Sequence, residues 1–238
     1  MVRPLAWTAI GGLSVGVVCL SLAYATGGSP LRRMVDLGLS SVGSCSAHGA
    51  TATERRLKWD GDDTVNIAGF ATVHYRGGEG DEVIVRGAPE AVANVEVQGG
   101  RITLNCHGTG SRTVDITLPG RVFRKMQLSG SGKVLLENVS QPDLVLGISG
   151  SGSLRAQGSV DRLTVSISGS GGAKLGELAV KQLTVKVAGS GNIEASPKEV
   201  ADITVSGAGD VRLLTRPAQL RTHVSGSGRI TQAASAMQ

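Results

Sequence analysis

Residues 148–171 read ISGSGSLRAQGSVDRLTVSISGSG, and the unit Ser-Gly-Ser-Gly stands near each end of this stretch. Related units occur six times in the second half of the chain and begin 18 to 20 residues apart, at Ser129, Ser149, Ser168, Ala188, Ser206 and Ser225. A repeat this short predicts a solenoid, in which each unit packs only against its neighbours. It is too short for a propeller blade, and the Asn- or Cys-centred frame of leucine-rich repeats is missing.

The phase of each repeat predicts which residues face inward. If the first residue of each unit is position 0, positions −3, −1, +5 and +7 are mostly aliphatic, as in Val165, Ile167, Ala173 and Leu175. Alternation with a period of two is typical of β-strands, so the odd positions are predicted to be buried and the even positions exposed. Because parallel crossovers are right-handed, we expect an all-β fold, a right-handed parallel β-helix (a single-stranded β-solenoid) with coils of about 19 residues.

Two glycines in each unit, at positions +1 and +3, share the inward parity. Without a Cβ atom, glycine can adopt a positive φ and let two strands meet at a tight corner. A phosphate-binding loop would need a following helix or a Lys-Ser/Thr pair, which these repeats lack. The predicted corner glycines are Gly130, Gly132, Gly150, Gly152, Gly169, Gly171, Gly189, Gly191, Gly207, Gly209, Gly226 and Gly228.

The N-terminal segment, residues 1–25, indicates export. Arg3 precedes an uncharged run from Leu5 to Ala25, which ends in Ala23-Tyr24-Ala25. This pattern is typical of a cleaved signal peptide. An uncleaved membrane anchor is the alternative, because the run is long enough to span a bilayer. The protein is therefore expected to be extracytoplasmic, in the periplasm or at the cell surface, and to contact membrane only through this segment.

The rest of the chain divides by composition. Residues 26–60 are rich in Gly, Ser, Ala and Arg without a sustained period, which predicts a linker. Residues 61–238 are predicted to form the solenoid. Short β-rich runs separated by Gly-rich turns indicate irregular coils at 61–123, and the repeats indicate regular coils at 124–238.

Two cysteines, Cys45 and Cys106, lie beyond the N-terminal segment. In an exported protein this pair predicts a disulfide, with two free thiols as an alternative. A lipobox at Cys45 is disfavoured, because this cysteine lies far beyond the apolar run. A metal site with His48 and His107 is also disfavoured, because Cys106 and His107 would point to opposite faces of a strand. No cofactor is expected.

Two further motifs precede the repeats: VNIAGF at residues 65–70 and GDEVIV at residues 80–85. With the Ser-Gly-Ser-Gly units, they make residues 63 to 230 resemble the bacterial proteins described as "putative auto-transporter adhesin, head GIN domain". The resemblance implies an extracytoplasmic β-solenoid. It carries over no catalytic residues.

The predicted rows of side chains do not indicate an enzyme. Some β-helices cleave acidic polysaccharides with carboxylates stacked on neighbouring coils, but Asp202, Glu194 and Asp210 each have non-acidic neighbours in their predicted rows. We therefore expect a non-catalytic solenoid that presents a flat β-face for adhesion or for envelope or surface interaction. The alternative is an exported polysaccharide-acting enzyme with a site near the N-terminal coils. Passive glycan binding would also be confined to these coils, because aromatic contact with a sugar could come only from Trp59, Phe70, Tyr75 or Phe123.

One outer row is basic. Its predicted members are Arg155, Lys174 and Arg212, interrupted by Glu194, in a chain of formal net charge +5. Such a row is suited to anionic envelope polymers, although a solvated face with no partner has the same appearance. Another surface protein, or end-to-end or face-to-face self-association, are further candidate partners. Nucleic acid is not expected, since no binding motif is present.

Overall fold

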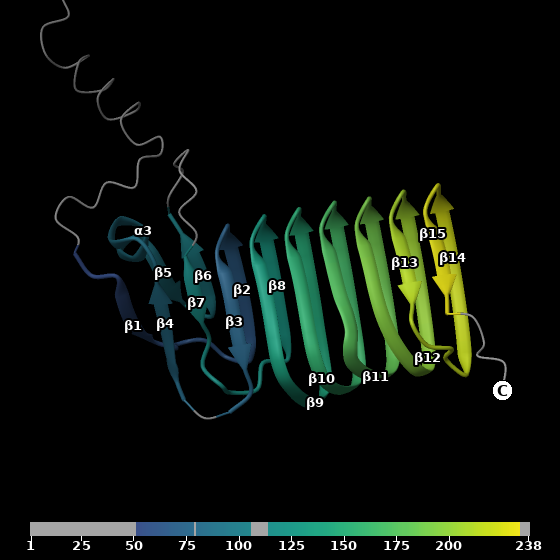
Figure 1. Ribbon diagram of the computed structural model, residues 1–238, viewed down its shortest axis with the longest axis horizontal. Coiled ribbons are helices and arrows are strands. Elements are labelled where there is room, and N and C mark those ends of the chain that lie inside the picture. The colour runs from purple at the N-terminus through teal and green to yellow at the C-terminus, as the bar shows by residue number, and fades with distance from the viewer. Residues whose placement is uncertain (1–50, 79, 106–113, 234–238) are drawn as a thin grey trace, which may run out of the picture. The chain divides into compact units, whose positions relative to one another are not determined.

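Parallel strands stack along the repeats in successive coils (Figure 1). The computed structural model describes residues 51–78, 80–105 and 114–233, which all lie within the unit Cys45–Gln238. Four long strands wrap from one face of a coil to the other. They are β9 (Lys133–Gly150), β10 (Ser153–Gly169), β11 (Gly172–Gly189) and β12 (Asn192–Gly207). Shorter strands complete the stack: β8 (Lys125–Gly130), β13 (Asp210–Leu213), β14 (Gln219–Gly226) and β15 (Arg229–Gln232).

The parallel solenoid predicted from the repeats is confirmed. β10 pairs in parallel with β9 on one side and β11 on the other, with Gly169 beside Gly150 and Gly189. The predicted parity also holds, because Val165, Ile167, Ala173 and Leu175 are all buried in one continuous aliphatic core. The inward side chains of one coil are covered by those of the next coil, so their burial depends on stacking. The handedness of the coil stays a prediction.

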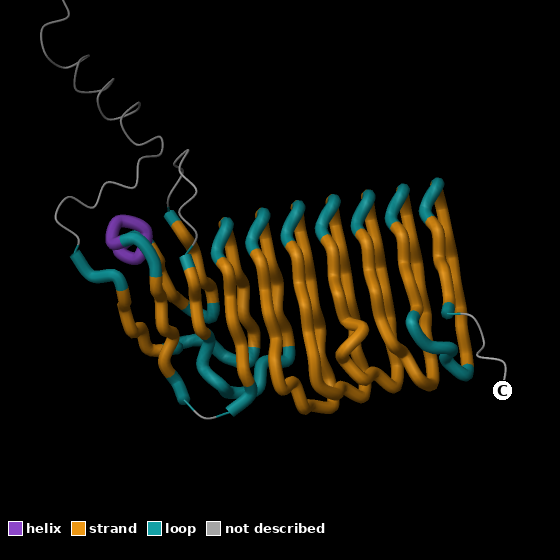
Figure 2. Tube along the Cα trace, in the orientation of Figure 1, coloured by secondary structure: helices purple, strands orange, loops and turns teal. Residues whose placement is uncertain are grey.

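The corner glycines take the conformation that glycine permits. The glycine at position +1 has φ between 113° and 128° in all six repeats. At Gly169 a Cβ atom would lie 2.5 Å from the carbonyl oxygen of Gly150, and at Gly171 it would lie 2.6 Å from that of Gly152. Figure 2 shows these corners as loops along one edge of the stack, while β9 to β12 continue as strands around the opposite edge.

A regular coil also precedes the repeats, which sequence reasoning missed. It consists of β2 (Thr64–Gly69) and β3 (Thr72–Arg76). β2 stacks on β8 with Gly69 beside Gly130, and β3 stacks on β9 with Val73 beside Val134. Its corner is Ala68-Gly69-Phe70-Ala71, and Gly69 again has a positive φ of 120°.

The described residues between 77 and 123 add further strands to this end of the stack. The predicted irregular coils at 61–123 need revision only in part, because two strands in this range make antiparallel pairs alone. β4 (Glu82–Arg86) is antiparallel to β7 (Asp115–Thr117) and to β1 (Glu54–Lys58), and β7 in turn pairs in parallel with β3. On the other face, β6 (Arg101–Leu104) is parallel to β2 and antiparallel to β5 (Val95–Gln98).

A short helix, α3 (Pro89–Ala93), lies between these two extensions and closes this end of the core. Its Ala91 and Val92 are buried. Arg55 of β1 donates hydrogen bonds to the carbonyl oxygens of Val92 and Ala93 at 3.1 and 3.2 Å. β1 lies inside the predicted linker 26–60, so that linker is shorter than predicted at its C-terminal end.

The described residues include no helix long and apolar enough to cross a membrane. The predicted signal or anchor at residues 1–25 lies outside the described residues, as do residues 26–50 of the predicted linker.

The corner geometry predicts a sharp difference between two adjacent substitutions. Gly169→Val adds a Cβ atom against the Gly150 carbonyl at a positive φ, so we expect a loss beyond the typical overpacking cost of about 1–3 kcal/mol. Ser170→Thr changes an exposed side chain and should alter the free energy of unfolding by less than about 0.5 kcal/mol. Denaturant unfolding measures both. Equal losses would show that the corner is assigned incorrectly.

Candidate functional site

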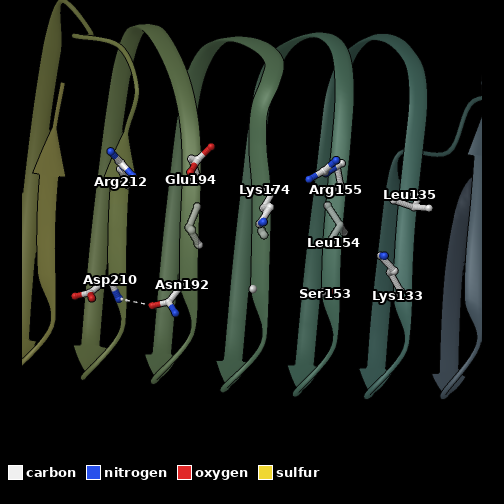
Figure 3. Close-up of a pocket in the computed structure, with 13 residues that line it drawn as sticks. Lys133, Leu135, Ser153, Leu154, Arg155, Lys174, Asn192, Glu194, Asp210 and Arg212 are labelled. Atoms are coloured by element: carbon white, nitrogen blue, oxygen red, sulfur yellow. Dashed lines mark hydrogen bonds between the residues drawn. The ribbon is translucent and has the colours of Figure 1, made fainter.

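The predicted basic row exists as neighbouring residues on one face. Strand register places Arg155 beside Lys174, Lys174 beside Glu194, and Glu194 beside Arg212. Leu135 of β9 precedes Arg155 in the same row. Figure 3 shows these side chains on successive strands, with the carboxylate of Glu194 between two cations.

A second row runs parallel to the first, two residues nearer the corners. Lys133 is followed by Ser153, then Gly172, then Asn192 on the next strands. The side-chain oxygen of Asn192 accepts a hydrogen bond of 3.2 Å from the backbone N–H of Asp210, which extends the row to β13. The middle of this row therefore carries the smallest side chains.

The two rows together line a shallow depression of about 590 Å³, which we call the groove. Ser153 and Gly172 make it low in the centre, while Lys133, Arg155 and Lys174 surround that centre. The buried strand residues Leu154, Ala173 and Ile193 also contribute to its lining. The lining of the groove is thus more apolar than polar, and its charges come from the exposed even positions.

The charges around the groove are largely uncompensated. Its lining carries Lys133, Arg155, Lys174 and Arg212 against only Glu194 and Asp210. None of these four cations forms an ion pair or side-chain hydrogen bond within the described part of the chain. The lining thus has more cations than carboxylates, and these cations can bind an external anion without first breaking an ion pair.

Some cations elsewhere on the coils form ion pairs. Arg162 donates to Asp143 at 2.6 and 2.8 Å, and the Nζ of Lys181 lies 2.8 Å from a carboxylate oxygen of Asp161. The hydrogen bond from Arg162 lowers the pKa of the Asp143 carboxyl. Such a pair stabilises the fold above the unfolded pKa of the acid, and the effect is lost as the pH falls through the folded pKa. Because both groups are exposed, the contribution is small.

The corners offer no ready anion cradle, because their backbone groups are used in stacking. Ser151 and Ser153 donate their N–H groups to the carbonyl oxygens of Gly130 and Gly132, both at 3.0 Å. The N–H of Ser170 is bound in the same way to the Gly150 carbonyl at 2.9 Å. A cradle needs several free N–H groups that converge on one anion.

The acidic residues have the row neighbours that the repeat in the sequence predicted. Asp202 lies between Thr184 and Arg221, and Asp210 is followed by Arg229. Within the described ranges, no group of three His, Cys, Asp or Glu residues is arranged to hold a metal ion. Cys45 and Cys106 lie outside the described residues, so their disulfide stays a prediction.

Three of the four aromatic residues near the N-terminal coils pack against one another inside the protein. The ring of Phe123 meets Trp59 and Tyr75 edge to face, with centroids 5.1 and 5.7 Å apart. The Trp59 indole donates to the carbonyl of Asp62 at 3.1 Å, and the Tyr75 hydroxyl donates to that of Arg121 at 3.0 Å. Burial raises the pKa of the Tyr75 phenol. Only Phe70 among the four is exposed, so this cluster offers no sugar-stacking platform.

Fold and surface together define a parallel β-solenoid with a capped N-terminal end and a basic groove. The chain belongs to the family described as "Putative auto-transporter adhesin, head GIN domain", which matches residues 63–217. Membership supports an adhesion-type role without catalysis.

Two crystal structures described as putative adhesins have a similar fold. The protein from Bacteroides fragilis NCTC 9343 is 16% identical, with a TM-score of 0.58 over 76% of this chain and 96% of that one. The protein from Parabacteroides distasonis ATCC 8503 is 15% identical, with a TM-score of 0.52 over 78% of this chain and 98% of that one. A search of curated proteins finds no match to the chain.

The aromatic cluster predicts a second pair of contrasting substitutions. Phe123 is 1% exposed and Phe70 is 52% exposed. We expect Phe123→Ala to lower the free energy of unfolding by about 3–5 kcal/mol, because it leaves a cavity between two other rings. Phe70→Ala should cost less than about 0.5 kcal/mol. Thermal and denaturant unfolding test both variants, and a stable Phe123→Ala protein would contradict a structural role for the cluster.

Proposed function

We propose that this protein is a non-catalytic, extracytoplasmic adhesion module that binds anionic polymers of a cell envelope or surface through its groove. The observation that carries the proposal is the excess of cations over carboxylates in the lining of the groove. Arg155 and Lys174 are neighbours in one row, and Lys133 lies two strands from Lys174 in the next row.

The geometry favours an extended ligand over a compact one. Neighbouring coils are about 4.8 Å apart, so a chain lying along the stack meets a new strand at each step. The groove is open along the stack and is not an enclosed cleft, so a compact ligand would stay largely exposed to solvent. A linear polymer of carboxylates or phosphates would instead contact several cations at once.

An extracytoplasmic location fits both the family and the N-terminal segment. Adhesin-like families act on surface partners, and the uncharged run in residues 5–25 is typical of an exported chain. The flat outer rows of the coils would then face the envelope or a neighbouring surface.

Charge reversal tests the groove directly. The triple variant Arg155→Glu, Lys174→Glu, Arg212→Glu should lose binding to polygalacturonate and to polyphosphate at least tenfold at low salt, because repulsion replaces attraction along the row. Wild-type affinity should fall as salt rises, since exposed charges are screened. Titration calorimetry or a sedimentation binding assay measures both effects.

A matched control separates the groove from net charge. Lys125→Glu, Lys186→Glu, Lys198→Glu changes the net charge equally, and none of these lysines lines the groove. We expect this variant to retain most of the wild-type affinity. Equal losses in the two triple variants would indicate non-specific attraction, and full binding by the groove variant would refute the proposal.

A further inference from the structure

The two ends of the stack differ in whether the core and the edge strand are covered. At the N-terminal end, α3 covers the core, and the edge strand β1 consists of Glu54, Arg55, Arg56, Leu57 and Lys58. Charged residues on an edge strand disfavour pairing with another chain. At the C-terminal end, β14 pairs with β12 on one side only, and no described residue covers its other edge.

The last coil leaves its inward side chains exposed. Leu220 is 39% exposed and Val224 is 41% exposed, whereas Ala201 and Val205 at the same positions one coil earlier are fully buried. Thr222, between them, is also exposed. A further layer on this end would bury these residues as stacking does elsewhere.

At the open edge, the backbone of β14 also has N–H and C=O groups without a strand partner among the described residues. Alternate residues of a parallel strand direct their N–H and C=O groups to one neighbour, and the residues between them serve the other neighbour. Along the coils, the even positions donate back to the preceding coil, as Ser227 does to Gly207 at 2.9 Å. Leu220, Thr222 and Val224 occupy odd positions, so their backbone groups face the open edge.

We propose that a second copy of this chain pairs with this edge, tail to tail, through an antiparallel β14–β14 contact. Centring the two-fold axis on Thr222 places the free backbone groups of Leu220, Thr222 and Val224 opposite their counterparts. Leu220 of one copy then faces Val224 of the other on the inner side, which makes two apolar cross-strand pairs. On the outer side Arg221 faces His223 and Gln219 faces Ser225, so no carboxylate is buried.

The assembly closes at two copies. Each copy uses its open end, and the remaining end carries α3 and the charged edge of β1, so the stack does not continue into a filament. The contact is about one strand pair wide, which predicts a weak, concentration-dependent dimer.

The dimer also has a consequence for the groove that rests on the proposed function. A two-fold axis perpendicular to the sheets keeps the groove of each copy on the same side. The two basic rows would then lie in line and could engage one long polymer, which increases avidity without new contacts. The pairing itself does not depend on polymer binding.

Sedimentation velocity of the full chain over about 1–100 µM, with no polymer present, tests the dimer. Thr222→Pro removes only an N–H group that faces the open edge, and proline is tolerated at such edge positions. We expect this variant to stay monomeric with a wild-type circular dichroism spectrum. Thr222→Val keeps the backbone group and should dimerise as the wild type does.

A second matched pair guards against misfolding of the proline variant. Val224→Lys places an inward-pointing charge in the interface and should abolish the dimer, whereas Ser225→Lys adds the same charge on the outer side and should weaken it far less. A wild-type chain that is monomeric at 100 µM would overturn the proposal, as would a dimer that persists in both Thr222→Pro and Val224→Lys. Polymer binding by a monomeric variant would leave the proposed function standing on its own.

Discussion

The close approach of consecutive corners is the constraint on which the structure depends. Each corner glycine lies against the carbonyl oxygen of the corner before it, and a side chain there would collide with that backbone. The positive φ at position +1 is the second part of the constraint, because few other residues adopt it. With both conditions met, every coil repeats the last one, and aliphatic residues at odd positions fill one continuous core.

The same constraint places the functional surface outside the core. The side chains at odd positions pack in the core, so charged and polar residues occur mainly at the even positions. Stacking of the coils aligns these exposed residues in rows. The groove arises because Ser153 and Gly172 are small while Lys133, Arg155 and Lys174 beside them are long and uncompensated. Elsewhere some charges are paired between coils, as with Asp143 and Arg162. Binding properties are thus tuned by single substitutions that leave the stacking intact.

The regular coils, the inward and outward positions within them and the basic row could be predicted from the sequence. The repeat itself shows which residues of successive coils lie side by side. The coil at 64–76 was missed because Ala68-Gly69-Phe70-Ala71 lacks the serines, although Val65, Ile67, Val73 and Tyr75 carry the inward pattern. The antiparallel cap could not be read from local strand signals, which do not encode pairing partners. The burial of Trp59, Tyr75 and Phe123 could not be predicted either, because their contacts join segments far apart in the sequence.

Mapping the contact surface by amide hydrogen exchange, with and without polygalacturonate, tests most directly that the groove is the binding surface. Slower exchange of backbone amides in the outer rows and edge strands would show where the bound polymer protects the protein. Protection is expected on β9 to β13 around Leu135, Arg155 and Lys174, with no change around Phe70 or on the serine rows that carry Ser149 and Ser168. Protection centred on Phe70 and the N-terminal cap, with the groove unchanged, would contradict the account.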